Sequence, residues 1–147
     1  MFEELLLEQY NIPVYIHNLD KELLTNTYDN CSEYDFERVV VDVDTIAVED
    51  KEHLKLLDGV DIEIIYTPYH TEGSCCYYLK DNKILFTGDS LFRNSVGRDD
   101  LPTSCPRYKE SSLDKLRNLP DDVTFYPGHG DISTIGREKK TNKLFMY

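Results

Sequence analysis

The sequence predicts a single layered α/β domain, and three patterns support that prediction. Residues 60–66 alternate apolar with acidic side chains, which is the period of a half-buried strand. Residues 75–79 and 83–87 are two β-rich segments joined by a short turn, a pattern typical of a hairpin. Residues 107–119 place their leucines on one face of a helix. The length of 147 residues fits one domain, so we expect residues 1–147 to share one core.

The N-terminal third predicts short elements. An amphipathic helix over residues 2–10 ends before Pro13, and residues 14–16 predict a short buried strand. Residues 19–24 predict another short helix, with Asn18 as its N-cap. A polar loop and two β-branched runs follow, at residues 25–35, 36–43 and 45–48.

In the second half, loops alternate with regular elements. Residues 67–74 predict a loop, and residues 88–106 predict a much longer one. Loops of that length in a compact domain are usually functional or disordered. A strand at residues 123–126 then runs into Pro127-Gly128-His129-Gly130, and a basic helix is expected over residues 135–144.

The composition argues against several classes of partner. The chain carries 28 acidic and 16 basic side chains, a formal net charge of −12, so we expect no nucleic-acid partner. No apolar run approaches the ~20 residues of a membrane span. The acidic start also lacks the basic region of a signal peptide, so we expect no membrane association. The four cysteines form no CxxC pair, which favours free thiols in a reducing cytoplasm, and Cys75 and Cys76 are interpreted as small buried hydrophobes.

Three polar residues stand just beyond the C-terminal ends of predicted strands: His70, Asp89 and His129. Such strand ends gather on one rim of a layered α/β domain, where ligand sites form. Imidazole and carboxylate groups together bind zinc or iron, and a bound ion lowers the pKa of a bound water. The alternative is that each is an ordinary loop residue, and spacing alone leaves both readings open. His17 and His53 are interpreted as structural or solvated residues.

Four segments resemble metallo-β-lactamase-fold hydrolases, in the order found in that family. Residues 67–74, TPYHTEGS, are similar to its TPGHTPGS segment, and residues 85–92, LFTGDSLF, are similar to its LFTGDTLF segment. Residues 95–102, SVGRDDLP, resemble a segment of its glyoxalase II-like branch. Residues 126–139, with YPGHG and TIGREK, resemble the ending of that branch. The resemblance is strongest over residues 64–142.

The resemblance implies an αββα sandwich with a binuclear metal site, usually of zinc, with iron or manganese as alternatives. It implies that His70 binds the first metal, that Asp89 bridges both metals and that His129 binds the second. A metal-bound hydroxide would then attack a thioester or another acyl bond. The chain looks like the short single-domain branch, similar to hydroxyacylglutathione hydrolases without their extra helical domain. No further catalytic residue is assigned.

The departures from the family pattern also carry expectations. The HxHxDH motif, which supplies four of the family's metal ligands, is absent, since no HxH occurs in this chain. The family places that motif just before segments like residues 1–17. We therefore expect an N-terminally truncated domain without its first strands, with weak or partial zinc occupancy and impaired hydrolysis. The alternative is a non-catalytic remnant that acts as a binding or assembly module. Tyr69 and Glu72 replace Gly and Pro, which puts larger or charged side chains near the predicted metal.

Two arginines in the long loop suggest the substrate. Arg93 and Arg98 follow Asp89, and guanidinium groups hold carboxylates well, so we expect a small anionic thioester. The alternative for Arg98 is pairing with Asp99 or Asp100 in its own loop. Missing strands would leave a sheet edge and an apolar face uncovered, so we also expect a homo-oligomer that covers them.

Overall fold

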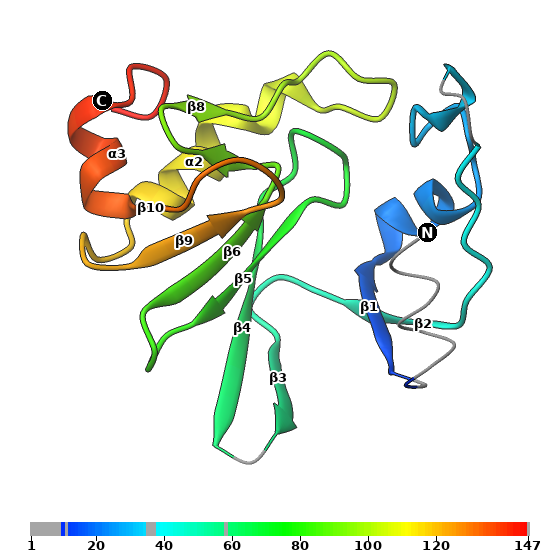
Figure 1. Ribbon diagram of the computed structural model, residues 1–147, viewed down its shortest axis with the longest axis horizontal. Helices are drawn as coiled ribbons and strands as arrows, with labels where there is room; N and C mark the ends of the chain where they lie inside the picture. Colours follow the sequence, from blue (N-terminus) through cyan, green and yellow to red (C-terminus); the bar gives the residue numbers. More distant parts are fainter. Residues whose placement is uncertain (1–9, 11, 35–37, 58, 147) are drawn as a thin grey trace. The chain divides into compact units, whose positions relative to one another are not determined.

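The computed structural model describes residue 10 and residues 12–34, 38–57 and 59–146. The chain forms two compact units, Met1–Val48 and Glu49–Tyr147 (Figure 1). This division does not decide between one domain and two, so the single domain over residues 1–147 stays a prediction.

The first unit contains a small parallel sheet. β1 (Val14–His17) pairs in parallel with β2 (Thr45–Val48), so a strand forms at both predicted places, but every residue of β1 is only partly buried instead of buried. A short 3-10 helix, η2 (Ser32–Tyr34), lies in the predicted polar loop. Residues 38–43 form no strand in spite of their β-branched side chains. The helix predicted at the start of the chain lies, for residues 2–9, outside the described residues.

The helix predicted after β1 forms as a 3-10 helix, η1 (Asn18–Leu24). Its cap is His17 and not Asn18, because Nδ1 of His17 accepts a hydrogen bond from the Leu19 N–H group at 3.3 Å. The imidazole thus satisfies one of the N–H groups that the start of a helix leaves unpaired. The structural reading of His17 is confirmed.

The second unit is built on a six-stranded mixed sheet with the strand order β10-β9-β6-β5-β4-β3. Its strands are β3 (His53–Leu57), β4 (Val60–Tyr66), β5 (Cys75–Leu79), β6 (Ile84–Gly88), β9 (Thr124–Pro127) and β10 (Ser133–Thr134). The loop after β6 contains a small hairpin of β7 (Leu91–Phe92) and β8 (Ser95–Val96). The helices are η3 (Pro106–Tyr108), α2 (Lys109–Arg117) and α3 (Ile135–Thr141).

The three strands that precede the candidate residues run in the same direction. β6 and β9 pair in parallel, and β5 is antiparallel to both β4 and β6. β4 therefore runs parallel to β6 and β9, and the C-terminal ends of these strands lie at the edge of the sheet towards the top of Figure 1. This is the common rim that the positions of His70, Asp89 and His129 predicted.

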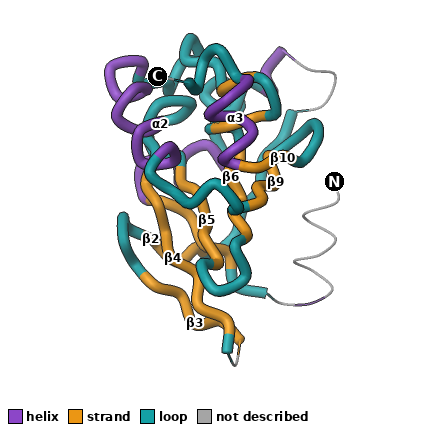
Figure 2. Tube along the Cα trace, turned by 90° about the vertical axis from the view of Figure 1, so that its left-hand side faces the viewer, coloured by secondary structure: helices purple, strands orange, loops and turns teal. Residues whose placement is uncertain are grey.

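One face of the sheet forms the core with both helices. Directly paired side chains share this face, and all are at most 8% exposed: Ile65, Cys76, Tyr78, Leu85 and Phe125. Leu113 and Leu116 of α2 and Ile135 of α3 join the same cluster, which confirms the leucine stripe of the predicted helix. α2 and α3 lie close together at one end of the sheet (Figure 2).

Some boundaries differ from the prediction for local reasons. β6 begins at Ile84 and not at Lys83, because Lys83 has a φ of 54° and closes the turn after β5. The helix predicted over residues 107–119 divides into η3 and α2, and α3 ends at Thr141, three residues early. The strand β3 is not predicted from the sequence, because His53 and Lys55 interrupt its apolar residues.

Candidate functional site

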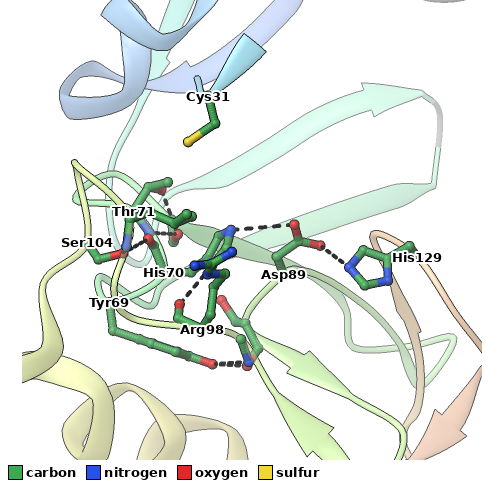
Figure 3. Close-up of polar contacts among 12 residues, drawn as sticks. Cys31, Tyr69, His70, Thr71, Asp89, Arg98, Ser104 and His129 are labelled. Atoms are coloured by element: carbon green, nitrogen blue, oxygen red, sulfur yellow. Dashed lines mark hydrogen bonds and ion pairs between the residues drawn. The ribbon is translucent and has the colours of Figure 1, made fainter. Parts of the chain in front are cut away.

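His70, Asp89 and His129 come together at the common strand ends (Figure 3). Nε2 of His70 lies 3.5 Å from Oδ2 of Asp89, and Nε2 of His129 lies 3.9 Å from Oδ1. The carboxylate therefore presents one oxygen to each imidazole. Asp89 between the two histidines is the order that the family resemblance implies.

Asp89 is held in a cradle that has no room for side chains. A Cβ at Gly128 would lie 2.4 Å from Oδ1 of Asp89, and a Cβ at Gly97 would lie 1.9 Å from its backbone oxygen. Only glycine lets the segment before His129 and the segment after β8 approach so closely. Gly128 N–H also donates to the Gly88 carbonyl at 2.8 Å, which fixes one loop against the other.

His70 is oriented through its second ring nitrogen. Nδ1 lies 2.9 Å from the backbone oxygen of Arg98, which can only accept, so Nδ1 donates the proton. In the neutral ring Nε2 then carries the lone pair that faces Asp89. A carboxylate and a lone pair repel each other unless a proton or a cation lies between them, and metal-binding histidines are commonly oriented in this way. The His70 side chain is mostly buried, at 17% exposed.

His129 is more open, with 75% of its side chain exposed. Its ring lies against Phe92 of β7, with ring centroids 4.4 Å apart and an interplanar angle of 31°. Gly130, with a φ of 82°, turns the chain immediately after it. The contact with Phe92 is therefore a main restraint on the direction of this imidazole.

The hairpin that carries Phe92 is fastened by α3 and the residue after it. Glu138 is fully buried, and its Oε2 accepts a hydrogen bond from the Asn94 N–H group at 2.7 Å. The Asn142 amide donates to the Ser95 carbonyl at 3.0 Å. Phe92 and Glu138 were not assigned a role from the sequence. The only signal for Glu138 was its place in the TIGREK segment.

Electrostatics favour an ionised Asp89. When His70 carries a proton on both ring nitrogens, its Nε2–H group donates to Asp89 and is the largest reason that the pKa of Asp89 lies below its ordinary value; His129 lowers it further, whereas burial opposes both. By contrast, burial raises the pKa of Cys76 to about 11. That thiol stays protonated, which fits the interpretation of Cys76 as a small buried hydrophobe, and all four cysteines are free.

The donor set fits part of a two-metal site. Two ligand atoms about 2.1 Å from one tetrahedral zinc ion lie about 3.4 Å apart, close to the His70–Asp89 separation of 3.5 Å. The His129–Asp89 separation of 3.9 Å is wider. Each ion would receive two of these ligands, whereas catalytic zinc sites have three protein ligands. Within the described ranges, no three His, Cys, Asp or Glu side chains form a group that could hold one ion.

The two candidate substrate arginines are engaged with carboxylates. Arg98 holds Asp100 through Nε and Nη2 at 2.7 and 3.0 Å, which is the alternative that the sequence allowed. Arg93 lies 3.1 Å from Asp131, two residues after His129. Both guanidinium groups stay partly exposed, so their role toward a substrate stays a prediction.

The structure also places the other residues that the sequence singled out. His53 pairs with Asp61 at 2.9 Å on the neighbouring strand, which confirms its structural reading. Tyr69, whose larger side chain was expected near the predicted metal, is fully buried in the core. Glu72 is exposed, and its carboxylate accepts from the Cys105 thiol at 3.5 Å. Among the described helices, none has the length and apolar composition needed to cross a membrane.

Comparison with known proteins places this geometry in a family. The sequence pattern of the metallo-beta-lactamase superfamily matches residues 4–129. An uncharacterized protein of Aquifex aeolicus is 34% identical over 148 positions, covering 93% of this chain and 65% of that protein. Hydroxyacylglutathione hydrolase GloC of Haemophilus influenzae is 41% identical over 87 positions, covering 58% of this chain and 41% of that protein.

A solved structure extends the likeness to the fold. The crystal structure of TTHA1623 in a di-iron-bound form has 30% sequence identity and a TM-score of 0.85, covering 96% of this chain and 69% of that chain. The present chain spans 65% of the length of the Aquifex relative. Because the family pattern covers most of the sequence and the α/β fold is shared, this chain belongs to the metallo-beta-lactamase superfamily.

Proposed function

We propose that this chain carries part of the active site of a glyoxalase II-like hydrolase, which cleaves a thioester or a related acyl bond with the help of metal ions. One observation carries the proposal: Asp89 presents one carboxylate oxygen to His70 and the other to His129. The two segments that resemble this branch, residues 95–102 and 126–139, support it. So does the identity of 41% with a hydroxyacylglutathione hydrolase over 87 positions.

In this proposal each side chain has a defined task. Nε2 of His70, Nε2 of His129 and the two carboxylate oxygens of Asp89 would hold the metal ions. Metal ions bound there would lower the pKa of a water molecule and so supply a nucleophile near neutral pH. The Arg98 carbonyl keeps the His70 lone pair on Nε2, and Phe92 restrains His129.

We propose zinc as the metal, with iron or manganese as alternatives. Imidazole and carboxylate ligands accept all three ions, so the donor set alone does not select one. The crystal structure of TTHA1623 is of a di-iron-bound form, and that observation concerns that protein. Elemental analysis after expression in medium supplemented with each metal in turn would identify the preferred ion.

We expect the 147-residue chain to bind zinc weakly, at less than one ion per chain after desalting, and to hydrolyse thioesters slowly. The reason is that His70, Asp89 and His129 give each ion two ligands instead of three. Zinc content by elemental analysis and turnover of an acyl-glutathione measure both quantities. Asp89→Asn should abolish the residual zinc, whereas the matched variant His53→Ala should keep it.

Two results would contradict these expectations in different ways. Two tightly held ions per chain with rapid thioester turnover would refute the impairment. Zinc content that is the same in Asp89→Asn and in the unsubstituted chain would refute the site itself.

A second candidate function is a non-catalytic binding or assembly module. The observation that favours it is that the described residues contain no three-ligand group for one ion. Under this reading zinc addition would change neither thioester turnover nor the thermal midpoint of unfolding, whereas a ligand of the folded state raises that midpoint.

A further inference from the structure

We propose that Tyr69 is a positioning residue whose phenol hydroxyl ties the His70 loop to the turn that carries Asp89, and so sets the separation of their ligand atoms. The inference concerns the geometry of these two side chains. It rests on the proposed function only where they are taken as metal ligands.

The hydroxyl group of Tyr69 contacts the backbone on both sides of the candidate site. It donates a hydrogen bond to the carbonyl of Ser90, the residue after Asp89. It accepts a hydrogen bond from the Gly97 N–H group at 3.1 Å. Gly97 in turn lies against the backbone oxygen of Asp89. One oxygen atom thus joins Tyr69, the residue before His70, to the turn that carries Asp89 and to the Gly97 segment that packs against it.

The backbone of the same segment is fixed to the far part of the long loop. The Tyr69 carbonyl accepts from the Cys105 N–H group at 2.9 Å, and the His70 carbonyl accepts from the Ser104 hydroxyl at 2.7 Å. These bonds hold residues 69 and 70 to the segment before η3. The bonds of the Tyr69 hydroxyl instead lead to Asp89, so they are the ones that relate the two candidate ligands.

A second contact also connects the His70 loop to the turn that carries Asp89. Oγ1 of Thr67 lies 2.9 Å from Oγ of Ser90 inside the core. The loop therefore keeps one connection to the Asp89 turn when the Tyr69 hydroxyl is removed. For this reason we expect the effect of its removal to be a local change in geometry rather than unfolding.

Because the Tyr69 hydroxyl is buried, the loss of its hydrogen bonds should have a measurable effect on the local structure. Its side chain is fully buried in the core cluster with Leu91 and Val96. Without the hydroxyl, the Ser90 carbonyl and the Gly97 N–H group would each lose a partner where water has little access, and would keep only their long mutual hydrogen bond of 3.4 Å. The position has glycine in the family segment that residues 67–74 resemble, and glycine has no side chain to make this link. The connection is therefore a property of this chain.

The test compares Tyr69→Phe with a matched variant, Tyr78→Phe. Tyr78 is also buried, at 4% exposed, but it lies in the middle of β5, near Glu63, Lys83 and Asp122. Both variants keep the ring and remove a hydroxyl. Long-range proton–nitrogen NMR spectra of the histidine rings in the metal-free chain report the tautomer and environment of His70. A chelator competition measures zinc affinity.

We expect Tyr69→Phe to shift or broaden the His70 ring signals and to weaken zinc binding at least fivefold, as for other residues that orient metal ligands. Tyr78→Phe should leave both unchanged. Unaltered His70 signals and zinc affinity in Tyr69→Phe, or equal changes in both variants, would overturn the proposal.

The outcomes separate this inference from the proposed function. If the unsubstituted chain binds no zinc but the His70 signals respond only to Tyr69→Phe, the positioning role stands and the metal role fails. If Tyr69→Phe does not fold, NMR spectra of the unsubstituted chain test the inference instead. A slowly exchanging Tyr69 hydroxyl proton with a contact to the Gly97 amide proton supports the inference, and its absence overturns it.

Discussion

Single residues set the shape of the candidate site more than its three polar side chains do. Gly128 and Gly97 enclose Asp89, a backbone carbonyl orients His70, and Phe92 restrains His129. None of these groups has chemistry of its own toward a substrate. They determine where the imidazoles and the carboxylate point, which is what a metal or a substrate would sense.

Gly128→Ala should disrupt the site directly. The added Cβ would lie 2.4 Å from Oδ1 of Asp89, so the carboxylate or the loop that carries His129 must move. We expect residual zinc affinity to fall at least tenfold and stability to fall by about 1–3 kcal/mol. Gly59→Ala is the matched variant, because it has a φ of 79° but open space around it. It should lose stability without losing zinc affinity; equal zinc affinities in the two variants would contradict the argument.

Arg93→Ala and Arg98→Ala test the predicted anionic substrate. If either guanidinium holds a substrate carboxylate, KM should rise about tenfold for an acyl-glutathione and little for a neutral thioester. Asp100→Asn is an informative companion, because it would weaken the bidentate partner of Arg98 and leave the guanidinium more available. The measurement is initial-rate kinetics at high protein concentration. Equal effects on both substrates, or none, would remove this role and leave Arg98 as a loop anchor.

At the scale of elements, hydrogen bonds from α3 hold the β7–β8 hairpin in place. The buried carboxylate of Glu138 receives hydrogen bonds from Ser133, Arg137 and the Asn94 N–H group. Asn94 has a φ of 63°, so the hairpin tip is held in a left-handed conformation that this bond supports. The position of Phe92, and with it the direction of His129, therefore depends on a helix that contributes no candidate ligand.

Glu138→Ala should destabilise the second unit strongly. It would leave the Asn94 N–H group and the Ser133 hydroxyl without their partner, at a cost of about 2–4 kcal/mol. We expect the thermal midpoint to fall by roughly 5–12 °C. Lys140→Ala, an exposed change on the same helix, should leave the midpoint within about 2 °C of its value. Similar midpoints for both variants in circular dichroism melts would show that this fastening contributes little.

Elements with a clear local pattern could be predicted from the sequence, and elements fixed by distant partners could not. β4 has the predicted bounds, because its apolar and acidic residues alternate. β3 was missed because its charged residues mask the pattern and its pairing with β4 decides its conformation. β7, β8 and β10 have two residues each, too few for any period.

The same distinction holds for the candidate site. His70, Asp89 and His129 each follow a predicted strand, and this placement predicted that they meet. Which ring faces which oxygen of Asp89 depends on the order of the strands in the sheet, which a local pattern does not give. Phe92, Glu138 and Tyr69 could not be assigned a role, because their partners lie 21 to 44 residues away along the chain or in a stacked ring. Contacts of this kind have no signature in local sequence.

At the scale of the whole molecule, we propose that the chain self-associates in solution. β3 and β10 are the outer strands of the six-stranded sheet, and outer strands invite pairing. Phe86 and Tyr126 are 45% and 38% exposed, with ring centroids 5.6 Å apart, an apolar feature that a second copy could cover. Light scattering should give a mass of at least two chains.

Phe86→Ser with Tyr126→Ser should shift this equilibrium toward the monomer at equal protein concentration. The paired change Tyr28→Ser with Tyr34→Ser, at two other exposed aromatic residues, serves as the control and should not. A single chain at all concentrations, with no partner, would count against self-association.

The hydrogen bond between His70 and residue 98 has a consequence for how this protein can vary. Its acceptor is a main-chain oxygen, so every amino acid at position 98 supplies the same group. This bond to the imidazole therefore does not depend on which side chain stands at position 98. Position 98 can be varied, in evolution or in a library, to seek new substrate preferences while the acceptor for the His70 ring is kept.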